Sequence, residues 1–390
     1  MKLKVVTFQR AQLVVLAVSH FIIDIFAGLL PAILPVVMSV FSISLGRAVA
    51  VLTILNLTSN FVQLITGHMR EDKRKPFFLY LGLIFSPAIC LIALLPAVRG
   101  SYPVILLLAV ITGCAVAMTH PEGLKAVHTL RRFSSVMGTS VYLSSGLLGY
   151  SAASFVSAAL VSLFGLGGLC WLVICPVTCI LGLIYFRVKI AVERKPAPNF
   201  ISQIDKEAVN FWPLLFMAIT AVSTTTILFG FLPTRLNQLG FELTFGGFSA
   251  MILGLAGALG PFLWAAVARK YSELTSVAIA LIIGIPLLIV YLFTMNSKIA
   301  VLALTATGLS STAVYPLMVS MARNARGFKL GQRMAFIVGG AWGLASLLLM
   351  AAGYAAENFG LQKVLTLAPL GYIIAAIIAV VLIIRRKTVQ

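Results

Sequence analysis

Two ionisable side chains, His20 and Asp24, lie four residues apart inside the first long apolar segment of the chain. On a helix, residues i and i+4 share one face, so the imidazole and the carboxyl group are expected to be neighbours. An ionisable group inside a membrane is costly unless it is paired or faces water, and such groups often mark ion or substrate pathways. We therefore expect Asp24 to exchange a proton with help from His20, or to bind a cationic substrate. The alternative is a structural pair that fixes this helix against its neighbours.

Only two of the ten acidic residues, Asp24 and Glu122, fall within apolar segments. Glu122 follows His120 and Pro121, and a proline inside a helix frees a backbone carbonyl and can kink the helix. Such a kink could turn both His120 and Glu122 toward a cavity, so both join the candidates for proton coupling. The alternative for Glu122 is a gate pair with Lys125, which lies three residues further along the same helix.

The elements that must position these groups are membrane-spanning helices. Of the 390 residues, 61% are hydrophobic and 10% are charged, whereas about a quarter are charged in soluble domains. A spanning helix needs roughly 20 mostly apolar residues, and runs of this length indicate helices rather than barrel strands. The twelve expected spans are 12–35, 46–67, 76–98, 102–124, 134–162, 167–187, 211–236, 245–268, 274–296, 299–322, 334–356 and 361–384.

Positive charge predicts the orientation of these helices. With the N-terminus inside, 24 lysines and arginines fall in the tails and cytoplasmic loops, and five fall on the opposite side. Because cytoplasmic loops are enriched in Lys and Arg, we expect both termini in the cytoplasm of a plasma membrane, of the bacterial inner-membrane type. The net charge of +19 lies in short pieces between apolar runs, so it does not indicate nucleic-acid binding.

A polar stretch, 188–210, divides the chain into an N-terminal half, 1–187, and a C-terminal half, 211–390. Pro121 and Pro316 lie 195 residues apart, half the chain length, and each is followed by a basic loop. Parallel repeats of this kind define one transporter architecture, with a substrate site near the membrane midplane. The sequence therefore predicts an all-α membrane protein with twelve transmembrane helices in two six-helix pseudo-repeats.

Twelve helices, a central linker and a charged loop after the second helix resemble the Major Facilitator Superfamily. Similarity to its fosmidomycin-resistance branch of efflux transporters is carried by Ser19-His20-Phe21-x-x-Asp24-x-x-x-Gly28-x-Leu30-Pro31-Ala32-x-Leu34-Pro35 and by His120-Pro121-Glu122. The resemblance implies the major facilitator fold and export of a small molecule. Two antiporter signatures depart from the family pattern: Ala109 stands in place of an arginine, and the fifth-helix motif is reduced to Gly146 and Gly149, which indicate close helix packing.

The loop after the second span resembles the family's cytoplasmic loop motif, with Glu71 in the place of an aspartate. The resemblance favours a cytoplasmic gate formed by Gly67, Glu71, Arg131 and Arg132, in which a charge pair biases the inward–outward equilibrium. The alternative is a solvated, positively charged loop.

Other polar and aromatic residues in the spans are candidates for lining a substrate cavity. Three of them share one face of the second span, where hydrogen bonding between helices is the alternative. For most of the others the alternative is ordinary packing. The candidates are Asn56, Asn60, Gln63, Tyr142, Thr225, Arg235, Ser311, Tyr315 and Trp342.

The sequence contains no phosphate-binding glycine loop, zinc-ligand spacing or nucleophile elbow, so we expect no enzymatic activity, cofactor or metal. The expected function is secondary active transport of a small polar or amphipathic molecule by alternating access, as proton-coupled efflux (antiport). The expected partners are that substrate, protons and membrane lipid, with the protein itself a monomer. The alternatives are proton-coupled uptake of a nutrient or metabolite, and a non-transporting membrane receptor or lipid-handling protein.

Overall fold

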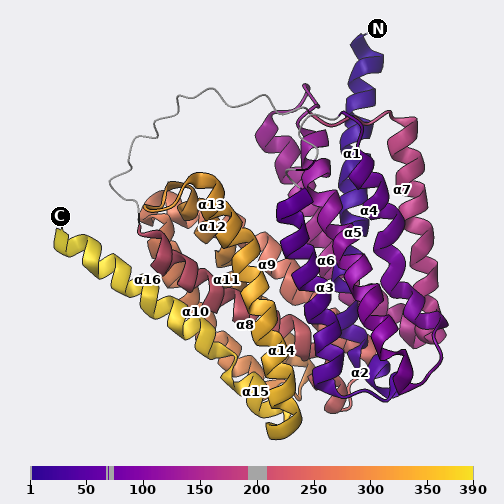
Figure 1. The fold of residues 1–390 in the computed structure, drawn as a ribbon. Coiled ribbons are helices and arrows are strands. Elements are labelled where there is room, and N and C mark those ends of the chain that lie inside the picture. Colours follow the sequence, from indigo (N-terminus) through magenta and orange to yellow (C-terminus); the bar gives the residue numbers. More distant parts are fainter. Residues whose placement is uncertain (1, 67–68, 70–73, 192–208, 390) are drawn as a thin grey trace. The chain divides into compact units, whose positions relative to one another are not determined.

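A computed structural model describes residues 2–66, 69, 74–191 and 209–389 (Figure 1). Eleven helical runs in this part of the chain are long and apolar enough to cross a membrane. One of them, Met137–Tyr185, has 49 residues, and a straight helix of that length would be more than twice the roughly 30 Å of a hydrocarbon core. It holds the two spans expected at 134–162 and 167–187, which are separated where Gly165 adopts a φ of 62°. The predicted all-α membrane class is confirmed.

The chain forms two compact units, one of Met1–Ser44 with Ala50–Pro196 and one of Leu45–Val49 with Ala197–Gln390. The predicted boundaries at 187 and 211 stay a prediction, because most of the expected linker lies outside the described residues. Two members of the expected cytoplasmic gate, Gly67 and Glu71, also lie outside them.

The first unit holds the first six expected spans. Its elements are α1 (Lys2–Gly28), α2 (Leu30–Phe41), most of α3 (Leu45–Thr66), α4 (Phe77–Phe85), the 3-10 helices η1 (Ser86–Leu94) and η2 (Arg99–Ser101), α5 (Tyr102–Val127), α6 (Ser135–Phe164), the 3-10 helix η3 (Gly165–Val173) and α7 (Ile174–Tyr185).

Helix α1 packs along α6 at close range (Figure 1). A Cβ atom on Gly149 would overlap the backbone of Phe21, and one on Gly28 would lie 2.6 Å from the carbonyl oxygen of Tyr150. Small residues allow transmembrane backbones to approach in this way. The paired glycines therefore fix the register of α1 against α6, and with it the depth at which the polar residues of α1 lie.

The second unit contains the last six expected spans. Its elements are α8 (Phe211–Gln238), α9 (Leu243–Tyr271), α10 (Glu273–Thr294), the 3-10 helix η4 (Lys298–Ala300), α11 (Val301–Ser310), the 3-10 helix η5 (Thr312–Val314), α12 (Tyr315–Asn324), α13 (Leu330–Met334), the π-helical turn η6 (Ala335–Gly340), α14 (Ala341–Phe359), α15 (Leu361–Leu367) and α16 (Pro369–Val389).

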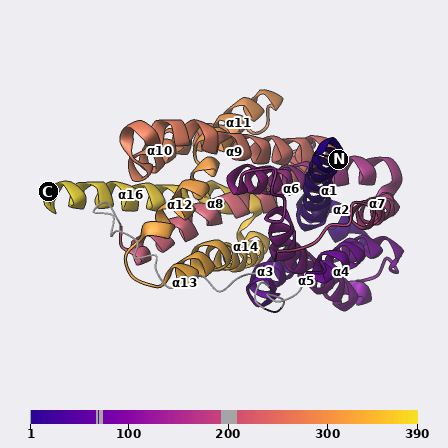
Figure 2. The same cartoon turned by 90° about the horizontal axis from the view of Figure 1, so that it is seen from above.

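Helix α8 forms the core of the second unit, where it packs against α9, α14 and α16 (Figure 2). Close approach again depends on small residues. A Cβ atom on Gly230 of α8 would lie 2.8 Å from the side chain of Leu349 on α14. On the other side, the Thr224 hydroxyl donates a 2.6 Å hydrogen bond to the carbonyl oxygen of Ala368, so α8 is tied to the start of α16.

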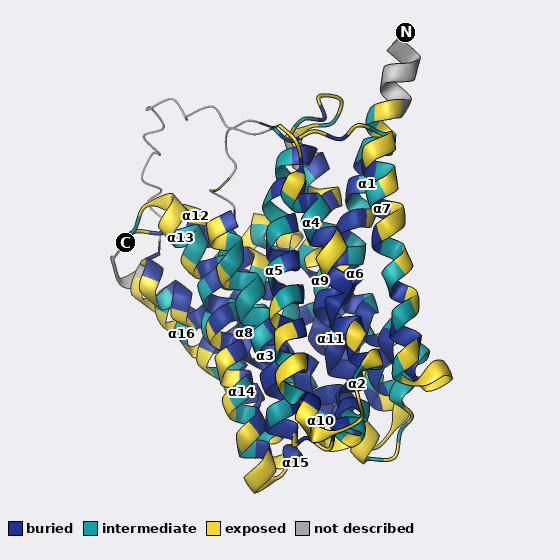
Figure 3. Cartoon of the chain, turned by 45° about the vertical axis from the view of Figure 1, so that its right-hand side comes forward, coloured by how far each residue is buried: buried dark blue, intermediate teal, exposed yellow. Residues whose placement is uncertain are grey.

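Exposed residues lie along many of the helices (Figure 3), and many of them are large and apolar. Examples are Phe293, which is 77% exposed, and Leu94, which is 72% exposed. Soluble monomers rarely expose apolar patches on this scale, whereas lipid tails solvate such side chains. The distribution agrees with a chain that is embedded in a membrane.

Candidate functional site

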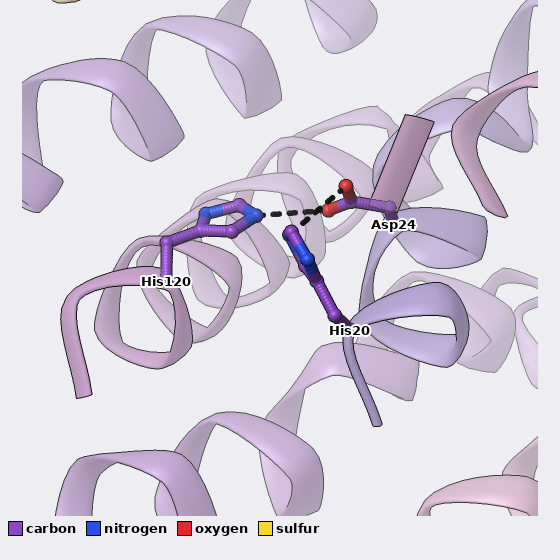
Figure 4. A group of neighbouring side chains, drawn as sticks. All are labelled: His20, Asp24 and His120. Carbon is purple, nitrogen blue, oxygen red and sulfur yellow. Dashed lines mark hydrogen bonds and ion pairs between the residues drawn. The ribbon is translucent and has the colours of Figure 1, made fainter. Parts of the chain in front are cut away.

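Three of the proton-coupling candidates, His20, Asp24 and His120, come together inside the first unit (Figure 4). The first two lie on α1 and the third lies on α5. His20 Nε2 is 3.4 Å from Asp24 Oδ2, and His120 Nε2 is 3.0 Å from Asp24 Oδ1. The carboxylate thus lies between two imidazoles, whose ring centroids are 4.9 Å apart. We call these three residues the His–Asp–His cluster.

Tyr142 on α6 fixes the orientation of His20. The Nδ1 atom of His20 lies 2.6 Å from the carbonyl oxygen of Tyr142. A carbonyl can only accept, so Nδ1 carries a hydrogen and Nε2 is the nitrogen that gains or loses a proton. The Tyr142 ring also stacks on the imidazole, with centroids 4.1 Å apart and planes 16° from parallel. Tyr142 itself is buried, and its hydroxyl occupies the space that a side chain on Gly123 would fill.

Gly146 on α6 leaves the room in which the cluster forms. A Cβ atom at this position would lie 2.5 Å from both Asp24 Oδ2 and His20 Nε2, closer than any ordinary van der Waals contact. The sequence predicted close packing at this glycine, and the structure shows that the atoms packed against it belong to the cluster. Sequence reasoning did not connect Gly146 with the candidate site.

The cluster is suited to holding a cation. With Nδ1 of His20 donating to a backbone carbonyl, the deprotonated Nε2 presents a lone pair toward a carboxylate oxygen. His20 Nε2 and Asp24 Oδ2 are then both acceptors, and two acceptors that face each other need a proton or another cation between them. The side chains of His20, Asp24 and His120 are 4%, 14% and 22% exposed, so this charge is largely removed from solvent, and His120 forms the more open side.

Glu122, the other acidic candidate, lies outside the cluster. It is 2% exposed, and its Oε2 accepts a 2.9 Å hydrogen bond from the backbone N–H of Leu79. That N–H lies in the first turn of α4, which begins after Pro76 without a side-chain cap of its own. A carboxylate at a helix N-terminus satisfies a backbone donor and complements the helix dipole. This hydrogen bond joins α5 to the start of α4.

The remaining candidates of the first unit are dispersed. The Asn60 side chain donates a 2.8 Å hydrogen bond to the carbonyl oxygen of Asn56 on its own helix. Gln63, on the same face of α3, is half-buried. Arg131 and Arg132 are exposed, and the backbone N–H of Arg132 donates to the side chain of Gln9 over 2.9 Å.

In the second unit, two of the cavity candidates form an aromatic pair. Tyr315 and Trp342 meet edge to face, with ring centroids 5.5 Å apart. The Tyr315 hydroxyl donates a 3.1 Å hydrogen bond to the carbonyl oxygen of Ile337. Ile337 lies in η6, and π-helical turns, which are rare, recur at functional sites.

The other candidates of the second unit lie apart from this pair. Thr225 shares a 2.9 Å hydrogen bond with the buried hydroxyl of Tyr372, an anchor that sequence reasoning missed. Arg235 donates a 2.7 Å hydrogen bond to Gln362. Ser311 is buried, and its hydroxyl has no hydrogen-bond partner among the described residues.

Comparison with known proteins decides the family. The sequence profile of the Major Facilitator Superfamily matches residues 16–348. The chain belongs to the Major Facilitator Superfamily. The resemblance predicted from the sequence is thereby confirmed, and the protein is a multi-pass membrane transporter of this superfamily.

Two curated relatives are distant. The chain is 24% identical over 160 residues to the fosmidomycin resistance protein of Escherichia coli K12, a match that covers 41% of this chain and 38% of that relative. It is 23% identical over 362 residues to the uncharacterised MFS-type transporter YfnC of Bacillus subtilis 168, which covers 90% of this chain and 87% of the relative. The chain thus matches well under half the length of the first relative.

Solved structures of the superfamily share the fold. One is the inward-facing, unoccupied form of a bacterial homologue of the human lysosomal transporter Spinster. It superposes with a TM-score of 0.76 at 15% sequence identity, and the match covers 96% of this chain and 97% of that chain. The occupied form of the same homologue gives a TM-score of 0.70 at 17% identity, with 95% and 96% covered. At such low identities the likeness establishes the fold alone.

Proposed function

We propose that this superfamily transporter exports a small polar or amphipathic molecule in exchange for protons, and that the His–Asp–His cluster is its proton site. One observation carries the proposal: a membrane-embedded carboxylate lies between two imidazoles from two different helices, at 3.0 and 3.4 Å. Ionisable groups at such depth are expensive, and in transporters they form proton relays.

The arrangement couples a proton to the packing of the helices. An ionised Asp24 attracts His120 on α5 through a charge-assisted hydrogen bond whenever an imidazole is protonated. A proton transferred to the carboxylate removes its charge and weakens this tie between α1 and α5. A change in protonation therefore alters the relative stability of conformations that differ in the distance between these helices, which is the requirement for coupled transport.

The proposal also includes the orientation. Both termini lie in the cytoplasm of a bacterial inner membrane, as the distribution of positive charge indicates. The export direction rests on the local similarity to the fosmidomycin resistance protein.

The test uses purified protein in liposomes that contain a trapped pH-sensitive dye, with the membrane potential clamped. Compounds are selected by their effect on the thermal unfolding of the protein, and fosmidomycin is included because of the relative's name. An antiporter alkalinises the lumen when a substrate is added outside, whereas a symporter acidifies it. A receptor binds the compound without any change in pH.

The variant Asp24→Asn is expected to abolish the pH change while leaving the protein folded. Glu242→Gln serves as the matched control, since it also removes one acidic charge but at an exposed position in front of α9. Lumenal acidification, or a pH change that persists in Asp24→Asn, would contradict the proposed mechanism.

A further inference from the structure

We propose that the His–Asp–His cluster is also a binding site for a divalent transition-metal ion of the Zn²⁺ and Co²⁺ class. This inference goes beyond proton coupling, because it rests on the positions of three ligand atoms rather than on transport. One ligand atom from each of His20, Asp24 and His120 lies within 4.8 Å of the other two.

The separation of each imidazole from the carboxylate is close to the edge length of a coordination tetrahedron. With metal–ligand bonds of about 2.0–2.1 Å, neighbouring ligand atoms in a tetrahedral site lie about 3.3 Å apart. His20 Nε2 lies 3.4 Å from Asp24 Oδ2, and His120 Nε2 lies 3.0 Å from the other carboxylate oxygen, Oδ1. Each imidazole nitrogen is therefore close to the edge distance from one oxygen of the carboxylate. A direct hydrogen bond between a charged imidazole and a carboxylate is shorter, about 2.7–2.9 Å. The His20–Asp24 separation is therefore longer than such a bond requires and wide enough for an ion.

The surroundings of His20 are those of a metal ligand. Histidines that bind metals nearly always donate their other ring N–H to a carbonyl or carboxylate, which fixes the tautomer and the ring orientation. His20 does so through Nδ1 and the carbonyl oxygen of Tyr142, at 2.6 Å. The stacked ring of Tyr142 holds the imidazole plane. Nε2 is thus directed at the cluster with its lone pair available before any ion arrives.

The ligand set selects the class of ion. Imidazole and carboxylate ligands together suit Zn²⁺, Co²⁺ and neighbouring first-row metals, whereas Mg²⁺ and Ca²⁺ prefer all-oxygen sites. Three protein ligands leave a fourth position open, as in zinc sites that exchange a bound molecule. His120, whose side chain is 22% exposed, forms the side through which an ion can enter. A bound metal ion replaces the protons of the cluster, so metal and proton compete.

The experiment is a titration of the full chain with Co²⁺, followed by competition with Zn²⁺ and with Mg²⁺. The protein is purified in detergent without a histidine tag. We expect one Co²⁺ per chain with the visible absorption of a four-coordinate ion, displaced by Zn²⁺ and unaffected by Mg²⁺. Asp24→Asn and His120→Gln are each expected to weaken binding by more than the roughly 10–100-fold that changes in outer-shell partners cause.

Two further variants separate ligation from structure. His128→Gln is the matched control, because His128 lies at the end of α5 against Thr139 and outside the cluster; it should bind Co²⁺ like the wild type. His120→Cys keeps a metal ligand and should add a sulfur-to-cobalt charge-transfer band, which no purely structural role of His120 can produce. Unaltered gel filtration and thermal unfolding show that each variant is folded.

Several outcomes would overturn the metal site: no Co²⁺ binding by the wild type, wild-type affinity in Asp24→Asn or His120→Gln, or loss of binding in His128→Gln. These outcomes are separable from failure of the proposed transport function. A protein that binds no Co²⁺ but loses its pH change in Asp24→Asn lacks the metal site and keeps the proton site. A protein that binds Co²⁺ but keeps its pH change in Asp24→Asn has the metal site, and Asp24 is then not its proton-coupling residue.

Discussion

Replacement of Gly146 by alanine tests whether the free space beside α6 is what allows the His–Asp–His cluster to form. The added Cβ atom would lie 2.5 Å from Asp24 Oδ2 and His20 Nε2, about 1 Å inside the optimal contact distance. The imidazole of His20 cannot move aside easily, because it is hydrogen-bonded to the Tyr142 backbone and stacked on the Tyr142 ring.

The expected magnitude follows from overpacking. Adding a methyl group to a filled site typically costs about 1–3 kcal/mol, which in a unit of this size lowers the unfolding midpoint by about 2–12 °C. Because the strain falls on the carboxylate and the imidazole, Gly146→Ala should also abolish the pH change that accompanies substrate flux. Thermal unfolding in detergent and the liposome assay measure the two effects.

Two other glycines serve as controls for this experiment. Gly149→Ala would push the new methyl group into the backbone of Phe21, so it should destabilise the packing of α1 on α6 more severely than Gly146→Ala. Gly167→Ala has nothing within 4 Å of the new Cβ atom and should behave like the wild type. If Gly146→Ala matches Gly167→Ala in stability and in proton movement, the cluster does not depend on this space and the reasoning is wrong.

Three further substitutions test contacts outside the cluster. Glu122→Gln keeps an acceptor oxygen for the Leu79 N–H but removes its charge, and should lower stability by about 1 kcal/mol in thermal unfolding. The liposome assay should still record proton movement. Tyr315→Phe removes the hydrogen bond to the π-helical turn and should lower the free energy of unfolding by about 0.5–1.5 kcal/mol. Unchanged stability would show that this hydrogen bond does not stabilise the fold. Tyr372→Phe leaves two threonine hydroxyls without a shared partner and should cost about 1–3 kcal/mol in the same unfolding assay.

Helix content and one local pair could be predicted from the sequence because both depend on short-range periodicity. Runs of roughly 20 apolar residues mark the spans, and spacing by four residues places His20 and Asp24 on one face. Family membership was likewise visible in short motifs. The contribution of His120 to the same site depends on how α5 packs on α1, and no spacing within the sequence encodes that packing.

The pairing of His120 with Glu122 shows why adjacency in sequence misleads on a helix. Residues two positions apart point about 200° apart around the axis, and α5 continues as one helix through Pro121. One side chain therefore reaches α1 and the other reaches α4. A search for short metal-ligand spacings misses the proposed metal site for a related reason, because its third ligand, His120, lies on another helix, 96 residues beyond Asp24.

The long separation in sequence between α1 and the helices that contact its polar pair has a consequence for biogenesis. A ribosome adds about 5–20 residues per second, so α6, whose Tyr142 carbonyl lies 122 residues beyond His20, is made roughly 6–24 s after α1. During that interval α1 must enter the bilayer with an acid and an imidazole whose later partners do not yet exist. The spacing of four residues then gives Asp24 a neighbour on its own helix, 3.4 Å away in the finished fold. The pair that we propose to move protons thus also gives the first helix an internal partner for its acid before the rest of the unit has been synthesised.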